Sequence, residues 1–220
     1  MFKYPLVVTI DTNIFDAAKY NLSDASTLRI LENHVKSGKI KVVLSDIVVQ
    51  ESKRHIAARV KEVCGIVNIA RNSALKVYNE HLISSIGMNE MFRIVESEDD
   101  IIAKEEKVFD DFLCAIDAEI LGTDLIDINS VLSDYFGAKP PFEESGKKKS
   151  EFPDAFIAQQ IRNRFGETET VVIVSNDKGF IRACRESENH LFFNSLGALY
   201  NAINLLKSQA LIQRKVIDRK

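Results

Sequence analysis

The chain of 220 residues is long enough for one domain with a large insertion, and with 45% hydrophobic and 28% charged residues it has the composition of a folded globular protein. Its formal net charge of −3 argues against broad phosphate binding by basic side chains alone, so a nucleic acid would have to be met by local basic patches or by bound cations. No apolar run approaches the roughly 20 residues that cross a bilayer, and the first residues lack the features of a secretory signal, so we expect no membrane association and a cytoplasmic location.

The first part of the chain alternates between strand and helix. Residues 6–10 form a short apolar run, mostly β-branched, which is typical of a strand buried on both faces of a parallel sheet. Ser23 and Asp24 are candidate caps for a helix that Gly38 closes, and a second strand is predicted over residues 40–44. This pattern predicts one β-α-β unit.

The middle of the chain is predicted to be helical. After Ser45, which can cap a helix, apolar residues repeat at helical spacing from residue 46 past residue 60, and the same periodicity returns between residues 66 and 83. A further helix is predicted over residues 99–121. Together these segments predict an all-helical insertion at about residues 65–140.

A loop rich in Gly, Pro and Lys precedes the last part of the chain. It covers about residues 137–150, and its Pro-Pro pair and three consecutive lysines predict a long mobile segment. The elements predicted after it alternate again: a helix over residues 151–165, a strand over 171–174, a short helix from 178, a strand over 191–193 and a last helix from 195.

Strands and helices that alternate at both ends of the chain predict an α/β fold. We expect a three-layer α/β/α sandwich around a central parallel sheet, formed by a single domain over residues 1–220 that carries the helical insertion. In such sheets, functional sites form at the carboxyl ends of the strands.

Four acidic residues are predicted to meet at that edge of the sheet. Asp11 and Asp177 come directly or closely after buried strands, Asp154 heads the apolar face of its helix, and Glu51 lies on a helix with an inward apolar side. Taken singly, each has an ordinary explanation. Asp11 and Asp177 would be turn residues that cap a helix, Asp154 a solvated first-turn residue favoured by the helix dipole, and Glu51 part of a surface ion pair. Taken together, four close carboxylates repel one another unless a cation binds them, and their oxygens suit Mg²⁺ or Mn²⁺.

The segments around these acids resemble the four acidic motifs of PIN and PIN-like nucleases, in the chain order of that family. The segments are Ile10–Asn13, Ser45–Glu51, Phe152–Ala155 and Val174–Phe180. The first and last motifs are the most specific, and the resemblance covers residues 65–140 poorly. The chain is also longer than the compact PIN toxins, which favours one of the larger PIN-like proteins.

The resemblance implies metal-dependent endonucleolytic cleavage of phosphodiester bonds, usually in RNA, with DNA as the other substrate. A bound divalent ion would make water reactive near neutral pH and offset the charge on the phosphate. The residues that the resemblance assigns are Asp11, Glu51, Asp154 and Asp177 as catalytic ligands of one or two Mg²⁺ or Mn²⁺ ions, with Asn13 and Ser175 as supporting polar groups.

Basic residues near the predicted site are candidates for phosphate contact. Lys147, Lys148 and Lys149 precede the helix of Asp154, and Lys178 follows Asp177 directly. The alternative is that these lysines are only part of a solvated loop and a solvated helix surface. Weaker candidates for phosphate contact are Arg162, Arg164, Arg182 and Arg185, and spare carboxylates near the site are Glu143, Glu144 and Glu151, of which Glu151 is the preferred fifth ligand.

Two other functions stay open at the level of sequence. A non-catalytic nucleic-acid-binding or scaffold protein would keep the same fold without turnover. A phosphotransferase on a similar sheet could use Asp11 as phosphate acceptor, although Asn13 stands where such an enzyme needs its second aspartate. A homodimer and an inhibitor partner are both compatible with the sequence, which identifies neither.

Overall fold

The structure of the protein is a computed structural model that describes residues 4–77, 80–85, 97–143, 150–166, 168–185 and 189–205. The chain forms two compact units. Residues 1–50 and 113–220 make up the first, called here the sheet unit, and residues 51–112 make up the second, called the helical unit. Each unit is described by itself.

The sheet unit is organised around five parallel strands in the order β3-β2-β1-β4-β5. Every strand pair recorded in the sheet is parallel, which confirms the predicted α/β fold with a central parallel sheet. The short apolar runs of the sequence suit strands that are covered on both faces. The strands are β1 (Leu6–Ile10), β2 (Ile40–Ser45), β3 (Glu119–Leu121), β4 (Val171–Val174) and β5 (His190–Phe193).

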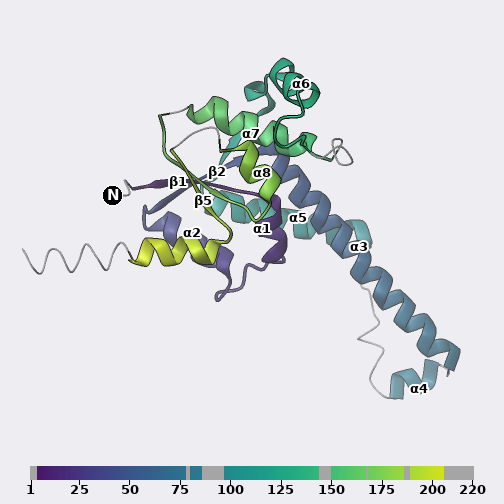
Figure 1. The fold of residues 1–220 in the computed structure, drawn as a ribbon. Helices are drawn as coiled ribbons and strands as arrows, with labels where there is room; N and C mark the ends of the chain where they lie inside the picture. Colours follow the sequence, from purple (N-terminus) through teal and green to yellow (C-terminus); the bar gives the residue numbers. More distant parts are fainter. Residues whose placement is uncertain are drawn as a thin grey trace, which may run out of the picture. The chain divides into compact units, whose positions relative to one another are not determined.

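Helices cover both faces of this sheet, as Figure 1 shows. On one face, α7 (Phe152–Phe165) packs beside α8 (Lys178–Ala183). On the other face lies α2 (Thr27–Lys36), beside the helical residues 196–205. The connection from β1 to β2 and the connection from β4 to β5 run in opposite directions along the sheet, so right-handed crossovers place their helices on opposite faces. The predicted three-layer sandwich is therefore confirmed.

The helical unit is built from long helices. The helix α3 (Asp46–Val77) begins in the sheet unit and continues into the helical unit, where α4 (Glu80–Ser85) and most of α5 (Glu98–Ala115) also lie. The Nζ atom of Lys53 on α3 lies 2.7 Å from Oδ2 of Asp110 on α5, so an ion pair joins these two helices. No described helix combines the length and the apolar character that crossing a membrane requires.

The predicted helix over residues 99–121 is wrong in its last part. The helix α5 ends at Ala115, Asp117 takes the left-handed conformation with φ 47°, and residues 119–121 form the edge strand β3. The side chain of Glu119 holds this short strand in place because Lys41 of β2 and Arg164 of α7 both donate hydrogen bonds to it. The predicted insertion at about residues 65–140 is therefore not all-helical, because its residues 119–121 form a strand of the sheet.

The sequence pattern did not predict three of the short elements individually, two of which come after β3. A 3-10 turn over Thr123–Leu125 and the helix α6 (Ile128–Phe136) follow it, and a further short helix, α1 (Thr12–Ala17), follows Asp11. Of the predicted mobile loop at about residues 137–150, positions 144–149 lie outside the described residues, and they include Lys147, Lys148 and Lys149.

Candidate active site

The register of the sheet brings two of the predicted motifs together. Ile10 at the end of β1 pairs with Val174 at the end of β4, so the next residues, Asp11 and Ser175, are neighbours across the two strands. The backbone N–H of Asp11 donates to the carbonyl oxygen of Val174 at 3.0 Å, which extends the pairing by one residue. The strand order reverses between β1 and β4, and ligands of such sheets bind in the crevice at this point.

A hydrogen-bond network links Asp11 to the segment that carries Asp177. The Oδ2 atom of Asp11 accepts hydrogen bonds from Nδ2 of Asn13 and from Oγ of Ser175, both at 2.5 Å. The Ser175 hydroxyl in turn accepts from the backbone N–H of Asp177 at 3.0 Å. Since Asp11 is only 7% exposed, these donors hold a buried carboxylate in a fixed orientation.

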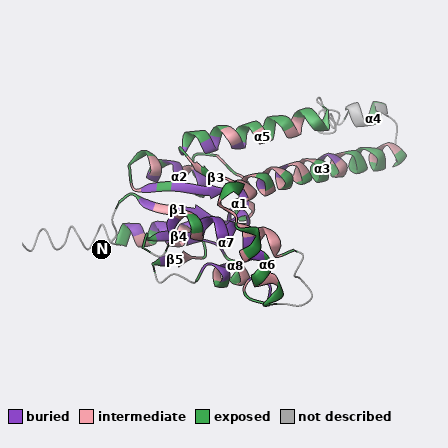
Figure 2. Ribbon diagram, turned by 90° about the horizontal axis from the view of Figure 1, so that it is seen from above, coloured by how far each residue is buried: buried purple, intermediate pink, exposed green. Residues whose placement is uncertain are grey.

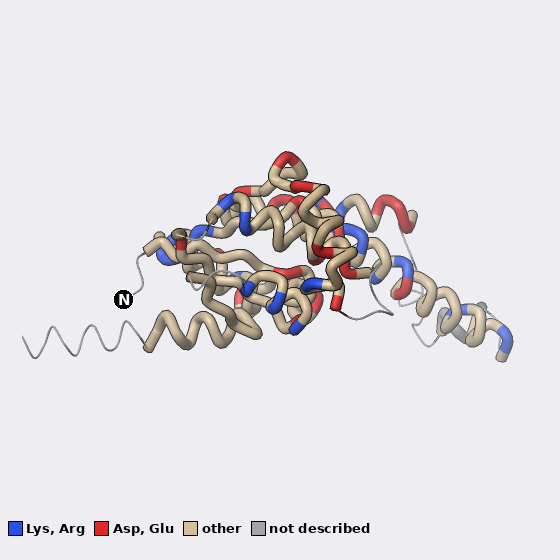
Figure 3. Tube along the Cα trace, turned by 45° about the horizontal axis from the view of Figure 1, so that its top comes forward, with Lys and Arg blue, Asp and Glu red and all other residues tan. Residues whose placement is uncertain are grey.

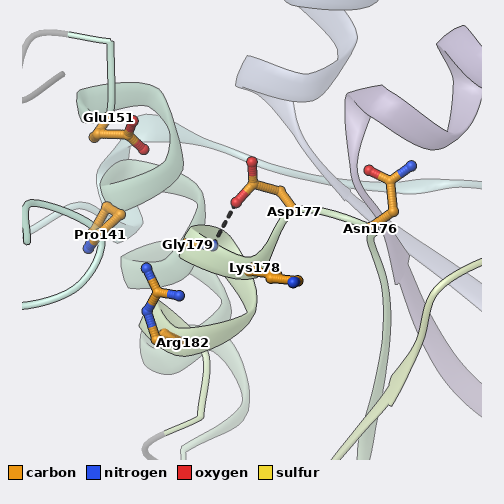
Figure 4. Close-up of a pocket in the computed structure, with 7 residues that line it drawn as sticks. All are labelled: Pro141, Glu151, Asn176, Asp177, Lys178, Gly179 and Arg182. Atoms are coloured by element: carbon orange, nitrogen blue, oxygen red, sulfur yellow. Dashed lines mark hydrogen bonds between the residues drawn. The ribbon is translucent and has the colours of Figure 1, made fainter. Parts of the chain in front are cut away.

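Asp177 has the capping role that the sequence left open as its ordinary explanation. Its Oδ1 atom accepts from the backbone N–H groups of Gly179 at 2.6 Å and Phe180 at 2.9 Å, which fixes the start of α8. The residue is exposed, and Figure 4 shows its other carboxylate oxygen pointing away from Gly179. Capping therefore orients the carboxylate and leaves one oxygen turned out of the cap.

The start of α7 is held by an aromatic cluster. Buried Phe142 lies against Val131 of α6 and Ala155 of α7, and the Phe142 and Phe152 rings have centroids 5.0 Å apart. This packing fixes the first turn of α7, which carries half-buried Asp154, and the preceding residue Glu151, the N-cap of α7. The cluster depends on contacts between separate segments, so periodicity alone did not reveal it.

An open pocket of about 390 Å³ lies where α8 begins (Figure 4). A Cβ atom added at Gly179 would lie 3.1 Å from Oδ1 of Asp177 and 3.9 Å from Oε2 of Glu151, so both carboxylates border the space beside this glycine. A larger residue at position 179 would fill that space. The pocket is lined by Pro141, Glu151, Asn176, Asp177, Lys178, Gly179 and Arg182.

The arginines that the sequence offered as weaker phosphate contacts have different surroundings. Arg164 is bound to Glu119, and the pKa of Glu119 is lowered by hydrogen bonds from Arg164 and Lys41. Arg162 donates to Gln159, and the guanidinium of Arg185 lies 5.8 Å from the centroid of the Phe192 ring. Arg182 alone of the four lines the pocket. Over the described chain as a whole, acidic and basic residues are interspersed (Figure 3).

The donor atoms at this edge suit a hard divalent cation, because they are carboxylate, amide and hydroxyl oxygens. Among the residues that the structure describes, no three His, Cys, Asp or Glu side chains are grouped closely enough to hold a metal ion by themselves.

The predicted site residues thus fall into three groups. The structure joins Asp11, Asn13 and Ser175 by hydrogen bonds and links them to the backbone of Asp177. Asp154 lies in the first turn of α7, which packs on α8. Glu51 is half-buried on α3 and belongs to the helical unit, so its place in the site stays a prediction.

The chain matches a known family. The family model described as PIN domain matches residues 8–180, which include all four acidic motifs and the pocket except for Arg182. No curated protein and no solved structure matches the chain.

Proposed function

Because the chain belongs to the PIN-domain family, whose members are generally nucleases, we propose that it is a divalent-metal-dependent nuclease that hydrolyses phosphodiester bonds. RNA is the proposed substrate class and DNA the alternative. The observation that carries this proposal is the network of Asp11, Ser175 and Asp177, which lies inside the matched region at the point where the strand order reverses.

The proposed metal ligands in the sheet unit are Asp11, Asp154 and Asp177. A bound Mg²⁺ or Mn²⁺ would supply activation of water and compensation of the negative charge on the phosphate. Asn13 and Ser175 keep the carboxylate of Asp11 oriented, and the backbone of α8 does the same for Asp177. Such fixed orientation matters because a reacting phosphate must be held in line with the attacking water.

Glu51 is the fourth proposed carboxylate. It is carried by α3 and belongs to the helical unit, so its role needs a separate test. The proposed phosphate contacts are Lys178, which lines the pocket, and Lys147, Lys148 and Lys149, which lie outside the described residues.

A non-catalytic nucleic-acid-binding protein is the second candidate. It is favoured by one observation, namely that no group of three potential ligands lies close together among the described side chains. A protein of this kind would bind RNA in the presence of Mg²⁺ or Mn²⁺ and leave it intact.

The test is cleavage of single-stranded and duplex RNA and DNA with Mg²⁺, with Mn²⁺ and with excess EDTA. We expect wild-type protein to cleave RNA only when a divalent ion is present, and Asp177→Asn to lose at least about 100-fold in rate. Asparagine keeps an oxygen that can cap α8, so folding should be retained. Asp24→Asn, an identical change at a fully exposed carboxylate, is the matched control. Cleavage that persists in EDTA contradicts the metal mechanism, and binding without cleavage favours the second candidate.

A further inference from the structure

The proposed metal chemistry gives no role to the side chain of Arg182, which lines the pocket. Its Nε atom donates to Oε2 of Glu143 at 2.6 Å, and its side chain is 41% exposed. Among the described residues this is the one hydrogen-bonding partner of the guanidinium. A guanidinium has five N–H donors in a planar fork, and no described residue accepts from the four donors on Nη1 and Nη2.

The pocket places these donors beside the proposed site. Arg182 lines the same cavity as Asp177 and Glu151, and Figure 4 shows its guanidinium on the side of Pro141, opposite the two carboxylates. Lys178 also lines the cavity, but in the same view its side chain runs away from Arg182. A volume of about 390 Å³ is at the small end of the range of ligand sites and is open to solvent.

We propose that Arg182, braced by Glu143, binds a phosphate of the nucleic-acid backbone next to the scissile bond. Two parallel N–H groups of an arginine fork match two phosphate oxygens, which a lysine cannot reproduce. None of the described residues that line the pocket is aromatic, so none of them offers a ring on which a base could stack. This inference rests on the proposed nuclease function and adds to it the residue that fixes the substrate.

Glu143 should weaken the binding of phosphate that Arg182 provides. Its carboxylate neutralises part of the charge of Arg182, and it competes with a phosphate for the guanidinium. Glu143 therefore restrains Arg182 and at the same time weakens its attraction for the substrate. Removing the carboxylate should strengthen binding, whereas removing the guanidinium should weaken it.

The experiment measures KM, kcat and the salt dependence of binding on a short single-stranded RNA. We expect Arg182→Ala to raise KM about tenfold with kcat little changed, because a contact made equally in the ground and transition states is lost. The slope of log K against log salt should fall by about 0.7, the value for one contact with a single strand. Arg182→Lys should recover the salt slope and only part of the affinity.

The matched variants separate this role from a structural one. Glu143→Gln should lower KM about twofold to threefold in the wild type, and it should have no effect in an Arg182→Ala background. Arg71→Ala removes the same charge at an exposed position of α3, away from the residues that line the pocket, and should leave KM and the salt slope unchanged. If Arg182→Ala and Glu143→Gln both raise KM and leave the salt slope unchanged, the pair only braces the fold and the inference is overturned.

Binding of the same RNA in EDTA, followed by fluorescence anisotropy, distinguishes failure of this inference from failure of the proposed function. A wild type that binds but never cleaves contradicts the nuclease, while weaker binding by Arg182→Ala than by Arg71→Ala still supports the phosphate contact. Equal binding by these two variants overturns the contact, whether or not the wild type cleaves.

Discussion

The sheet unit and the helical unit are stabilised in different ways. In the sheet unit the inner strands β1, β2 and β4 are mostly buried, with Val8, Val42 and Val174 fully inaccessible. Asp11 and Ser175, which follow β1 and β4, are joined by a hydrogen bond. In the helical unit α3 carries apolar side chains on its surface, and Val63 and Ile69 are 59% and 68% exposed. Figure 2 shows the same contrast between buried strands and an exposed α3.

The difference between the two units affects how firmly each can orient a catalytic carboxylate. Asp11 is positioned by contacts between strands that are far apart in the sequence, since its partner Ser175 is 164 residues away. The backbone of Glu51 is held by the local hydrogen bonds of the helix α3. A side chain fixed by non-local partners keeps its orientation only while the whole sheet is folded, and the sheet unit therefore couples its site to its core.

The largest expected effect tests whether the helical unit contributes to catalysis. Glu51→Gln should reduce RNA cleavage by about 100-fold, as expected when a metal ligand is lost, and urea unfolding measured beside it shows that the variant is folded. The control is Glu62→Gln, the same change at an exposed position of α3. Full activity of both variants would mean that the proposed carboxylates of the sheet unit suffice.

The next effect tests the network at the edge of the sheet. Ser175→Ala removes a donor to buried Asp11 and the acceptor of the Asp177 N–H, so it should cost about 1–3 kcal/mol of unfolding free energy and also slow cleavage. Ser73→Ala on the exposed surface of α3 should change stability by less than about 0.5 kcal/mol. Equal stabilities of the two variants would contradict the coupling of the site to the core.

Much of the sheet and part of the site could be predicted because they depend on local signals. Short apolar runs predicted β1, β2 and β4, and the rule that sites follow parallel strands predicted that Asp11 and Asp177 lie at one edge of the sheet. Ser175 was predicted as a supporting group only through the family resemblance. The capping of α8 by Asp177 was also accessible, since a turn aspartate before a helix is a common cap.

Other features depend on contacts that no local pattern encodes. The strand β3 has three residues and is fixed by Glu119, whose partners come from two other elements. Gln160, fully buried on α7, donates to Asp46 at 2.7 Å and to the carbonyl oxygen of Gly122 at 3.0 Å, which ties the end of β2 to the end of β3. No local pattern around Asp46 indicates this partner, which is 114 residues away in the sequence.

A smaller effect, confined to the sheet unit, depends on pH. Burial lowers the pKa of His34, and the positive charge of Lys39 lowers it further. The unfolded chain therefore binds a proton at a higher pH than the folded chain. The neutral imidazole of His34 thus contributes to the unfolding free energy fully above pH 6.5, and this contribution is lost as the pH falls towards the lowered pKa. The urea midpoint should fall between about pH 8 and about pH 5, and His34→Phe should make this fall smaller by the contribution of His34.

The control for this pH dependence lies in the other unit. His81 is exposed on α4, so His81→Gln should leave the decline of stability with acid unchanged. The Phe side chain also keeps contact with the Tyr200 ring, whose centroid is 4.9 Å from that of His34. If His34→Phe retains the full acid loss, other groups of the chain are responsible for it.

The smallest effect concerns the polar contact that joins α3 to α5. Lys53 and Asp110 are 31% and 47% exposed, and a pair so accessible to water is screened and costs side-chain entropy to form. A double-mutant cycle with Lys53→Met and Asp110→Asn should give a coupling of about 0.5 kcal/mol. A coupling above about 2 kcal/mol would mean that the helical unit, like the edge of the sheet, is held by a specific polar contact, and the contrast between the two units would then lie in their apolar burial alone.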